Sequence, residues 1–231
     1  MRRIVAVDAA RGFAVLLMIA YHFSFDLNYF GLIHQDLNHE VFWLASRSFI
    51  VSLFLFIAGI SLVLASNMNA SHFRTRQTRL FAAACAVSLA SWLMFPESYI
   101  YFGILHFIFV ASLIGRFFLD RPKIALISGL AVLVLGLTFS NAIFDRPYLQ
   151  WIGFMTHKPY TEDYVPVFPW LGVVLIGIFS GNFLSNDAAR FVKVAGGKWS
   201  RRLAFAGRHS LLVYLLHQPI LLGILYLALK W

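Results

Sequence analysis

The chain has 231 residues, of which 60% are apolar and only 13% charged, and its mean hydropathy is +0.76. About a quarter of the residues of a soluble globular domain are charged, so this composition excludes that class. Apolar stretches of about 20 residues, the length that crosses a hydrocarbon core, recur along the chain. We therefore predict an all-α, polytopic membrane helix bundle. The single cysteine, Cys85, excludes an intrachain disulfide.

Hydropathy predicts about seven transmembrane helices within a single domain that covers residues 1–231. We expect no cleaved signal peptide at the start, because polar residues interrupt the first apolar segment and no small-residue cleavage site follows it. The predicted spans are residues 4–25, 41–65, 79–95, 99–116, 124–143, 166–184 and 207–229.

The distribution of charge predicts a cytoplasmic N-terminus. With that orientation most Lys and Arg residues face the cytoplasm, as the positive-inside rule requires. They are Arg2 and Arg3, the loop with Arg74, Arg76 and Arg79, the turn with Arg116, Arg121 and Lys123, and the loop from Arg190 to Arg208. The net charge of +9 thus reflects membrane topology, and we expect no nucleic-acid partner. Attraction to anionic lipid and binding of an anionic cytosolic ligand both remain open for these loops.

The first predicted span, "VDAARGFAVLLMIAYH", carries three polar groups on one face. Asp8 and Arg11 are three residues apart, and His22 follows Arg11 by almost a whole number of helical turns. The stripe extends over about 21 Å of helix axis, at 1.5 Å per residue. It favours a polar cavity through the bundle over an ion pair that only fixes helix packing, although both interpretations stay open.

Other predicted spans also place polar side chains at membrane depth. Arg47 lies in the second span, where an arginine needs a carboxylate, carbonyl groups or an anionic substrate. His106 lies in the fourth span, and Ser210 and His217 share a face of the seventh. Histidines in three spans are many for a purely structural bundle. A haem site that uses them as axial ligands is one alternative.

Two predicted outer loops also carry groups of chemical interest. The segment "FGLIHQDLNHE" offers His34 beside further His and carboxylate side chains, and these could ligate zinc. The pattern lacks two histidines four residues apart, however, and we expect no metal. The segment "TEDYVPVFPW" places Asp163 at the membrane border before two prolines, as either a substrate mouth or a plain helix start would.

Five motifs in order resemble a known family. "VDAARGFAVLLMIAYH", "LFLFIAGISL", "FGILHF", "DYVPVFPW" and "GRHSLLVYLLHQP" are similar to segments of the bacterial membrane proteins related to heparan-alpha-glucosaminide N-acetyltransferase. That group belongs to a broader set of transmembrane acyltransferases, and the likeness extends over nearly the whole chain. The chain has fewer predicted spans than the full-length family enzymes and lacks their large lumenal domain, so heparan is not the expected acceptor.

The resemblance implies transfer of an acetyl or other acyl group from cytosolic acyl-CoA to an amine or hydroxyl of a sugar-containing acceptor. In the broader set the histidine that ends the first helix is catalytic, which would be His22. In the heparan enzymes a later histidine has a counterpart at His34, so the choice between the two stays open. On this interpretation His106 and Arg47 are candidate oxyanion donors, and Asp163 positions the acceptor or orients a histidine.

We expect the donor to bind from the cytoplasmic side, because CoA is polyanionic and the inner loops are basic. The predicted donor-binding residues are Asp8, Arg11, Arg47, His209, Ser210 and His217. The expected partners are acyl-CoA, a carbohydrate or glycolipid acceptor, membrane lipid and, as an option, a second copy of the chain. The expected location is the bacterial cytoplasmic (inner) membrane. A transporter or channel that uses the same polar cavity, or a scaffold without activity, is the alternative.

Overall fold

The structure, a computed structural model, describes residues 4–66, 69–186 and 197–229. Within these ranges it is helical, with no strand and one isolated β-bridge, between Phe102 and Tyr164. The all-α prediction is confirmed. The elements are α1 (Val5–Tyr29), α2 (Val41–Leu64), α3 (Ala70–Met94), α4 (Ile104–Gly115), η1 (Arg116–Phe118), α5 (Pro122–Thr138), η2 (Ala142–Asp145), η3 (Gln150–Ile152), α6 (Val167–Asn186), α8 (Lys198–Arg208) and α9 (Ser210–Leu229).

Among the described residues, four helices are long and apolar enough to cross a membrane: Val5–Tyr29, Val41–Leu64, Val167–Leu184 and Ser210–Leu229. Two shorter apolar segments, Ile104–Phe118 and Pro122–Thr138, overlap the predicted spans at 99–116 and 124–143. The chain is thus an integral membrane protein by length, composition and family. The number of seven spans and the cytoplasmic N-terminus stay predictions.

Helix boundaries differ from the sequence prediction at two basic segments. The predicted loop before the third span is helical, because α3 begins at Ala70 and includes Arg74, Arg76 and Arg79. Half of its residues are good helix formers (Ala, Arg and Gln), and no proline or glycine stops the helix. The end of the predicted inner loop likewise forms α8. Arg2, Arg3, residues 187–196 and Lys230 lie outside the described residues.

The helices group into two compact units. Unit 1 comprises Met1–Phe54 and Asp187–Trp231, and unit 2 comprises Leu55–Asn186, so the boundary falls inside α2. The prediction of a single domain remains a prediction.

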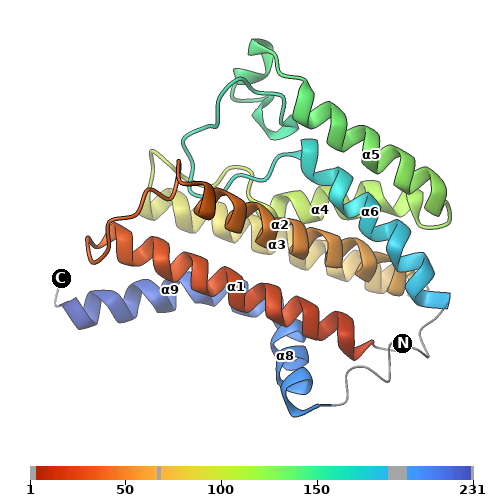
Figure 1. Ribbon diagram of the computed structural model, residues 1–231, viewed down its shortest axis with the longest axis horizontal. Helices are drawn as coiled ribbons and strands as arrows, with labels where there is room; N and C mark the ends of the chain where they lie inside the picture. Colours follow the sequence, from red (N-terminus) through yellow and green to blue (C-terminus); the bar gives the residue numbers. More distant parts are fainter. Residues whose placement is uncertain (1–3, 67–68, 187–196, 230–231) are drawn as a thin grey trace. The chain divides into compact units, whose positions relative to one another are not determined.

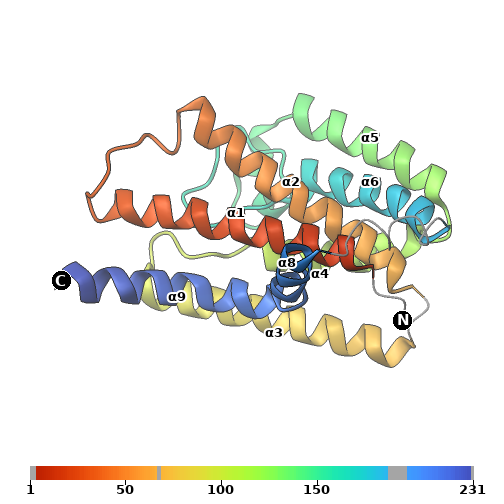
Figure 2. The same ribbon diagram turned by 60° about the horizontal axis from the view of Figure 1, so that its bottom comes forward.

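In unit 1, α1 packs along α9 and is crossed by α8 (Figures 1 and 2). The backbones of α1 and α8 touch at two glycines: a Cβ at Gly12 would collide with the Leu203 carbonyl, and one at Gly207 with the Asp8 carbonyl. Farther along α1, Phe30 packs with Leu222 and Leu225 of α9. α1 and α9 run in the same direction. Their facing polar residues lie between the glycine contacts with α8 and the Phe30 contacts with α9.

In unit 2, α5 and α6 form the most extensive helix pair, visible side by side in both views (Figures 1 and 2). Glycines again set the separation, since Gly129 faces Gly172 across this pair and Gly59 of α2 faces Gly177 of α6. Small residues at helix contacts are typical of membrane bundles, where close van der Waals packing replaces the hydrophobic effect between helices. α6 departs from helical geometry at Phe168, before Pro169, because the residue before proline favours extended backbone.

Replacing Gly12 by Ala should destabilise unit 1, because the new methyl group would meet backbone atoms of α8, which cannot rotate away. We expect a loss of about 1–3 kcal/mol, the usual cost of overpacking, seen as a lower thermal midpoint in detergent. Gly223→Ala is the matched control: this helical glycine of α9 has open space around it, so alanine should be neutral or slightly stabilising. Equal midpoints for the two variants would contradict the glycine contact.

Candidate functional site

The predicted histidines of α1 and α9 meet in unit 1. The ring centroids of His22 and His217 lie 4.8 Å apart, with the rings nearly perpendicular. Nδ1 of His22 lies 2.9 Å from the Met18 carbonyl, and Nδ1 of His217 lies 2.6 Å from the Tyr214 carbonyl. A carbonyl oxygen only accepts, so both Nδ1 atoms carry the hydrogen when the rings are neutral. Both Nε2 atoms then present a lone pair.

One helical turn beyond His22, Asp26 is buried, with 1% of its surface exposed. Gln218 of α9 donates from Nε2 to Asp26 Oδ1 over 2.6 Å. Neither residue is among the site residues that the sequence predicts. A signal was available for Asp26, because it follows His22 by four residues and Asp8 by five full turns, and so continues the polar stripe.

The other end of the stripe lies where α1 meets the C-terminus of α8. Arg11 donates from Nη1 to Asp8 Oδ1 at 3.0 Å and to the Gly207 carbonyl at 3.3 Å. A cation at the C-terminus of a helix is favoured, because unpaired carbonyls concentrate partial negative charge there. The exposed His209 ends α8, its ring 4.7 Å from that of Phe205, and Ser210 begins α9. The predicted residues Asp8, Arg11, His209 and Ser210 therefore gather in this region.

Arg47 of α2 interacts with the Tyr21 side chain. Tyr21 lies beside His22 on α1, and their ring centroids are 6.0 Å apart. The other edge of Tyr21 contacts Trp43, 5.9 Å between centroids, which fixes the start of α2 against α1. The structure thus places Arg47 beside Tyr21, the chain neighbour of His22, within unit 1.

His34 lies on the exposed loop that follows α1. It lines a shallow surface hollow together with Asn28 and Glu40. Asp36 in this loop accepts hydrogen bonds from the backbone and lies 2.9 Å from His39 Nδ1. The hydrogen bond with the His39 side chain holds the pKa of the Asp36 carboxyl below its usual range. No group of three or more metal-binding side chains occurs among the residues described.

His106 and Asp163 take part in local hydrogen bonds of unit 2. Ser88 Oγ donates to the Ile100 carbonyl at 2.6 Å and accepts from His106 Nε2 at 3.1 Å, while the Gly103 N–H donates to His106 Nδ1 at 3.3 Å. Asp163 accepts from the Ile104 N–H at 2.8 Å. Both side chains therefore fasten the start of α4. Their catalytic roles stay predictions.

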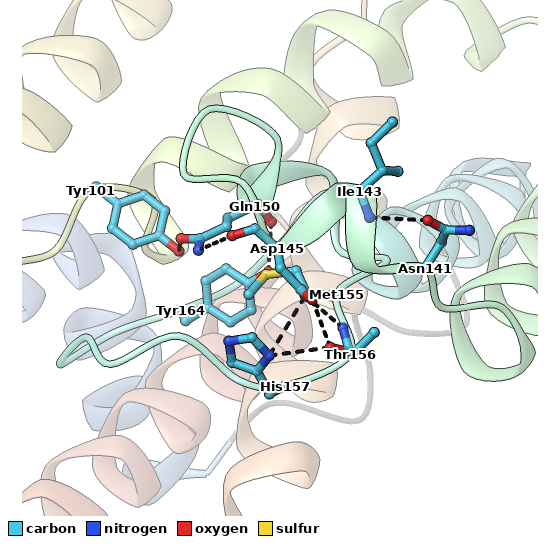
Figure 3. A network of polar contacts seen from close by, with 9 residues as sticks. All are labelled: Tyr101, Asn141, Ile143, Asp145, Gln150, Met155, Thr156, His157 and Tyr164. Carbon is cyan, nitrogen blue, oxygen red and sulfur yellow. Dashed lines mark hydrogen bonds and ion pairs between the residues drawn. The ribbon is translucent and has the colours of Figure 1, made fainter.

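A further polar network in unit 2 holds the long loop between α5 and α6 (Figure 3). Asp145 accepts from the backbone and hydroxyl of Thr156 at 2.9 and 2.7 Å, and its carboxylate lies 3.7 Å from His157. Gln150 accepts from the Tyr101 hydroxyl and donates to the Asp145 carbonyl. The backbone hydrogen bond from Thr156 is the main reason that the pKa of Asp145 lies below its usual range.

Comparison with known proteins identifies one family. The family model described as "Heparan-alpha-glucosaminide N-acetyltransferase, catalytic" matches residues 3–219. No curated protein and no solved structure matches the chain. The matched range includes all residues of the polar stripe on α1, together with His217 and Gln218 on α9.

The lowered pKa of Asp145 predicts how the loop responds to acid. Its hydrogen bonds to Thr156 are fully present above the unfolded pKa, near 3.8, and are lost as the pH falls through the lower pKa of the folded state. We expect the hydrogen-exchange protection factor of the Thr156 amide to fall below about pH 4. In Asp145→Asn, which has no carboxyl to titrate, that acid-dependent change should disappear. A wild-type protection factor that stays constant from pH 5 to pH 3 would contradict this role.

Proposed function

The chain belongs to the heparan-alpha-glucosaminide N-acetyltransferase catalytic family, and from this membership we propose an acyl-CoA-dependent transfer reaction. An acetyl group moves from CoA to an amine or hydroxyl of a sugar-containing acceptor. The observation that carries the proposal is the His22 ring, whose Nδ1 is bound to its own helix so that Nε2 presents a lone pair. A transferase of this kind needs such a base or nucleophile.

His22 can act by two routes. As a general base its Nε2 takes the proton of the acceptor while the acceptor atom attacks the thioester carbonyl carbon. The C–S bond then breaks, and the imidazolium returns the proton to the CoA thiolate. As a nucleophile, Nε2 itself takes the acetyl group and passes it on. The Met18 hydrogen bond orients the ring for either route.

The basic end of unit 1 is the proposed site for the CoA phosphates. Arg11 lies there beside α8, which carries Lys198, Arg201, Arg202 and Arg208. The eleven residues from Arg11 to His22 correspond to about 17 Å along the helix. This distance suits an extended pantetheine arm, with its phosphates at Arg11 and its thioester at His22. No metal takes part in this scheme.

Arg47 is the proposed donor to the oxyanion that forms on the thioester carbonyl. Fixed donors at the developing charge contribute strongly in a site that excludes water. Arg47 is held beside Tyr21, the neighbour of His22, so it belongs to the same part of unit 1. No step is assigned to His106, Asp163 or His34.

The residues of α8 also support a location at the cytoplasmic membrane. The exposed Trp199 and Phe205 accompany the basic residues of α8, a composition that suits the interface with anionic lipid. With the N-terminus and α8 on the cytoplasmic side, the chain is a multi-pass protein of the bacterial inner membrane. It takes acyl-CoA from the cytosol and modifies an acceptor on the outer side.

His22→Ala should abolish acetyl transfer and leave acetyl-CoA binding intact, since the imidazole acts on the reacting atoms and not on the phosphates. We expect a loss of at least about 100-fold in turnover, the lower range for a general base. His34→Ala is the matched control and should retain activity. Inactive His34→Ala together with active His22→Ala would move the base to the outer loop, and substrate flux through liposomes without CoA would favour the transporter alternative.

Arg11→Ala should weaken acetyl-CoA binding, because it removes a cation from the proposed phosphate site. Charge-assisted hydrogen bonds contribute about 1.5–3 kcal/mol, which corresponds to a rise in Kd of at least about tenfold. Titration calorimetry with acetyl-CoA measures this change. Arg146→Ala, on the loop of unit 2 after η2, is the control, and an equal Kd for both variants would remove Arg11 from the donor site.

A further inference from the structure

Three buried acceptor atoms of unit 1 lack a hydrogen-bond partner. They are Asp26 Oδ2, Gln218 Oε1 and His217 Nε2, and they are found among the described residues of α1 and α9. Buried polar atoms without partners are uncommon, and each one needs an explanation. All three accept hydrogen bonds when Asp26 is ionised and His217 is neutral with hydrogen on Nδ1. A ligand that satisfies them must therefore be a hydrogen-bond donor.

The hydrogen bond between Gln218 and Asp26 places two of these atoms side by side. Gln218 donates to one carboxylate oxygen of Asp26, so the second oxygen of Asp26 and the amide oxygen of Gln218 lie next to that hydrogen bond. His217 follows from the adjacent position of α9 and contacts His22. Since Asp26 and His22 are four residues apart, their side chains lie on one face of α1, about 6 Å apart along the axis.

The charge of Asp26 adds a second requirement: the ligand must carry a positive charge as well as hydrogen-bond donors. An ionised carboxylate at membrane depth needs a cation or a proton. The ion pairs found in the described part of the chain do not include Asp26. α9, the helix packed against it here, contains no Lys or Arg from Ser210 to Leu229. While Asp26 is ionised, the cation that pairs with it therefore comes from a bound molecule.

We propose that Asp26, together with Gln218, binds the ammonium group of a protonated amine acceptor one helical turn from His22. The inference rests on the proposed function and narrows it from an amine or hydroxyl to an amine. An ammonium group offers three N–H donors, and the two free oxygens can take two of them. The positive charge of the acceptor also removes the cost of the buried carboxylate.

The reaction requires two protons to be removed from the ammonium group, and the site offers two bases, Asp26 and His22, to accept them. A protonated amine and acetyl-CoA give an amide, CoA thiol and one released proton. Asp26 accepts the first proton, which leaves a neutral amine whose nitrogen can attack the thioester carbon. His22 accepts the second proton as the N–C bond forms and returns it to the CoA thiolate as the C–S bond breaks. The proton on Asp26 then leaves to water as the released one. The amide product is uncharged, so it no longer pairs with Asp26 and can depart.

Asp26→Asn tests this assignment with little change in shape, because the asparagine oxygen can still accept from Gln218. The probes are a 2-amino sugar and the same sugar with a hydroxyl in place of the amine. We expect kcat/KM for the amino sugar to fall by about 10- to 100-fold, as for loss of a charge-assisted hydrogen bond. The value for the hydroxyl sugar and the KM for acetyl-CoA should stay within about threefold. Asp120→Asn, the same change at an exposed aspartate, should match the wild type.

Binding of the amino sugar without acetyl-CoA separates the two proposals. If the wild type binds the amino sugar and Asp26→Asn does not, while neither transfers acetyl, the ammonium site stands and the transferase proposal falls. Equal kcat/KM for Asp26→Asn and the wild type would overturn the ammonium site and leave the transferase proposal intact. Absence of amino-sugar binding by the wild type would overturn the ammonium site as well.

Gln218→Met provides a second variant that keeps the length of the side chain. It should weaken amino-sugar binding less than Asp26→Asn, because it removes a dipole and not a charge. In the double variant the two effects should be non-additive, since the residues bind one group through one hydrogen-bonded pair. Full additivity would show that Asp26 and Gln218 act separately and would contradict a shared site.

Discussion

The free-energy cost of placing polar groups in hydrocarbon determines how the helices of unit 1 contact one another. A polar side chain at membrane depth is stabilised by a hydrogen-bonding partner, and several partners of the polar residues on α1 come from helices at the far end of the sequence. Arg11 donates to Asp8 and to the last turn of α8, and one carboxylate oxygen of Asp26 accepts from Gln218 of α9. Each contact ties the first helix to the last two. The need for hydrogen-bonding partners therefore holds these helices together and also gathers the reactive groups where α1 contacts α8 and α9.

The sequence predicts the polar stripe on α1 well, but it does not predict how far the stripe extends. The spacing of Asp8, Arg11 and His22 depends only on helical periodicity, which α1 follows. Asp26 falls just beyond the predicted span, which ends at residue 25, whereas α1 continues to Tyr29. Charged residues lower the hydropathy without ending a helix, and an aspartate four residues after a histidine can lie on the same buried face.

Side chains that meet through tertiary packing were the hardest to assign. His106 resembles a catalytic histidine in sequence, yet both its ring nitrogens have partners near the start of α4. No periodicity within one helix could show that Ser88 lies opposite. The sequence pattern does predict histidines in several spans. It does not predict that His22 and His217 are in contact. Their pairing depends on how α1 and α9 align.

The common direction of α1 and α9 limits the membrane topology of the chain. Two helices that both cross a bilayer in the same sense must be separated by an odd number of other crossings. The passes from α1 through α9 are therefore odd in number, provided that both of these helices span. Four passes, the number suggested by helix length alone, would violate this parity. If all four of these helices span, at least one shorter or more polar helix must also traverse the bilayer.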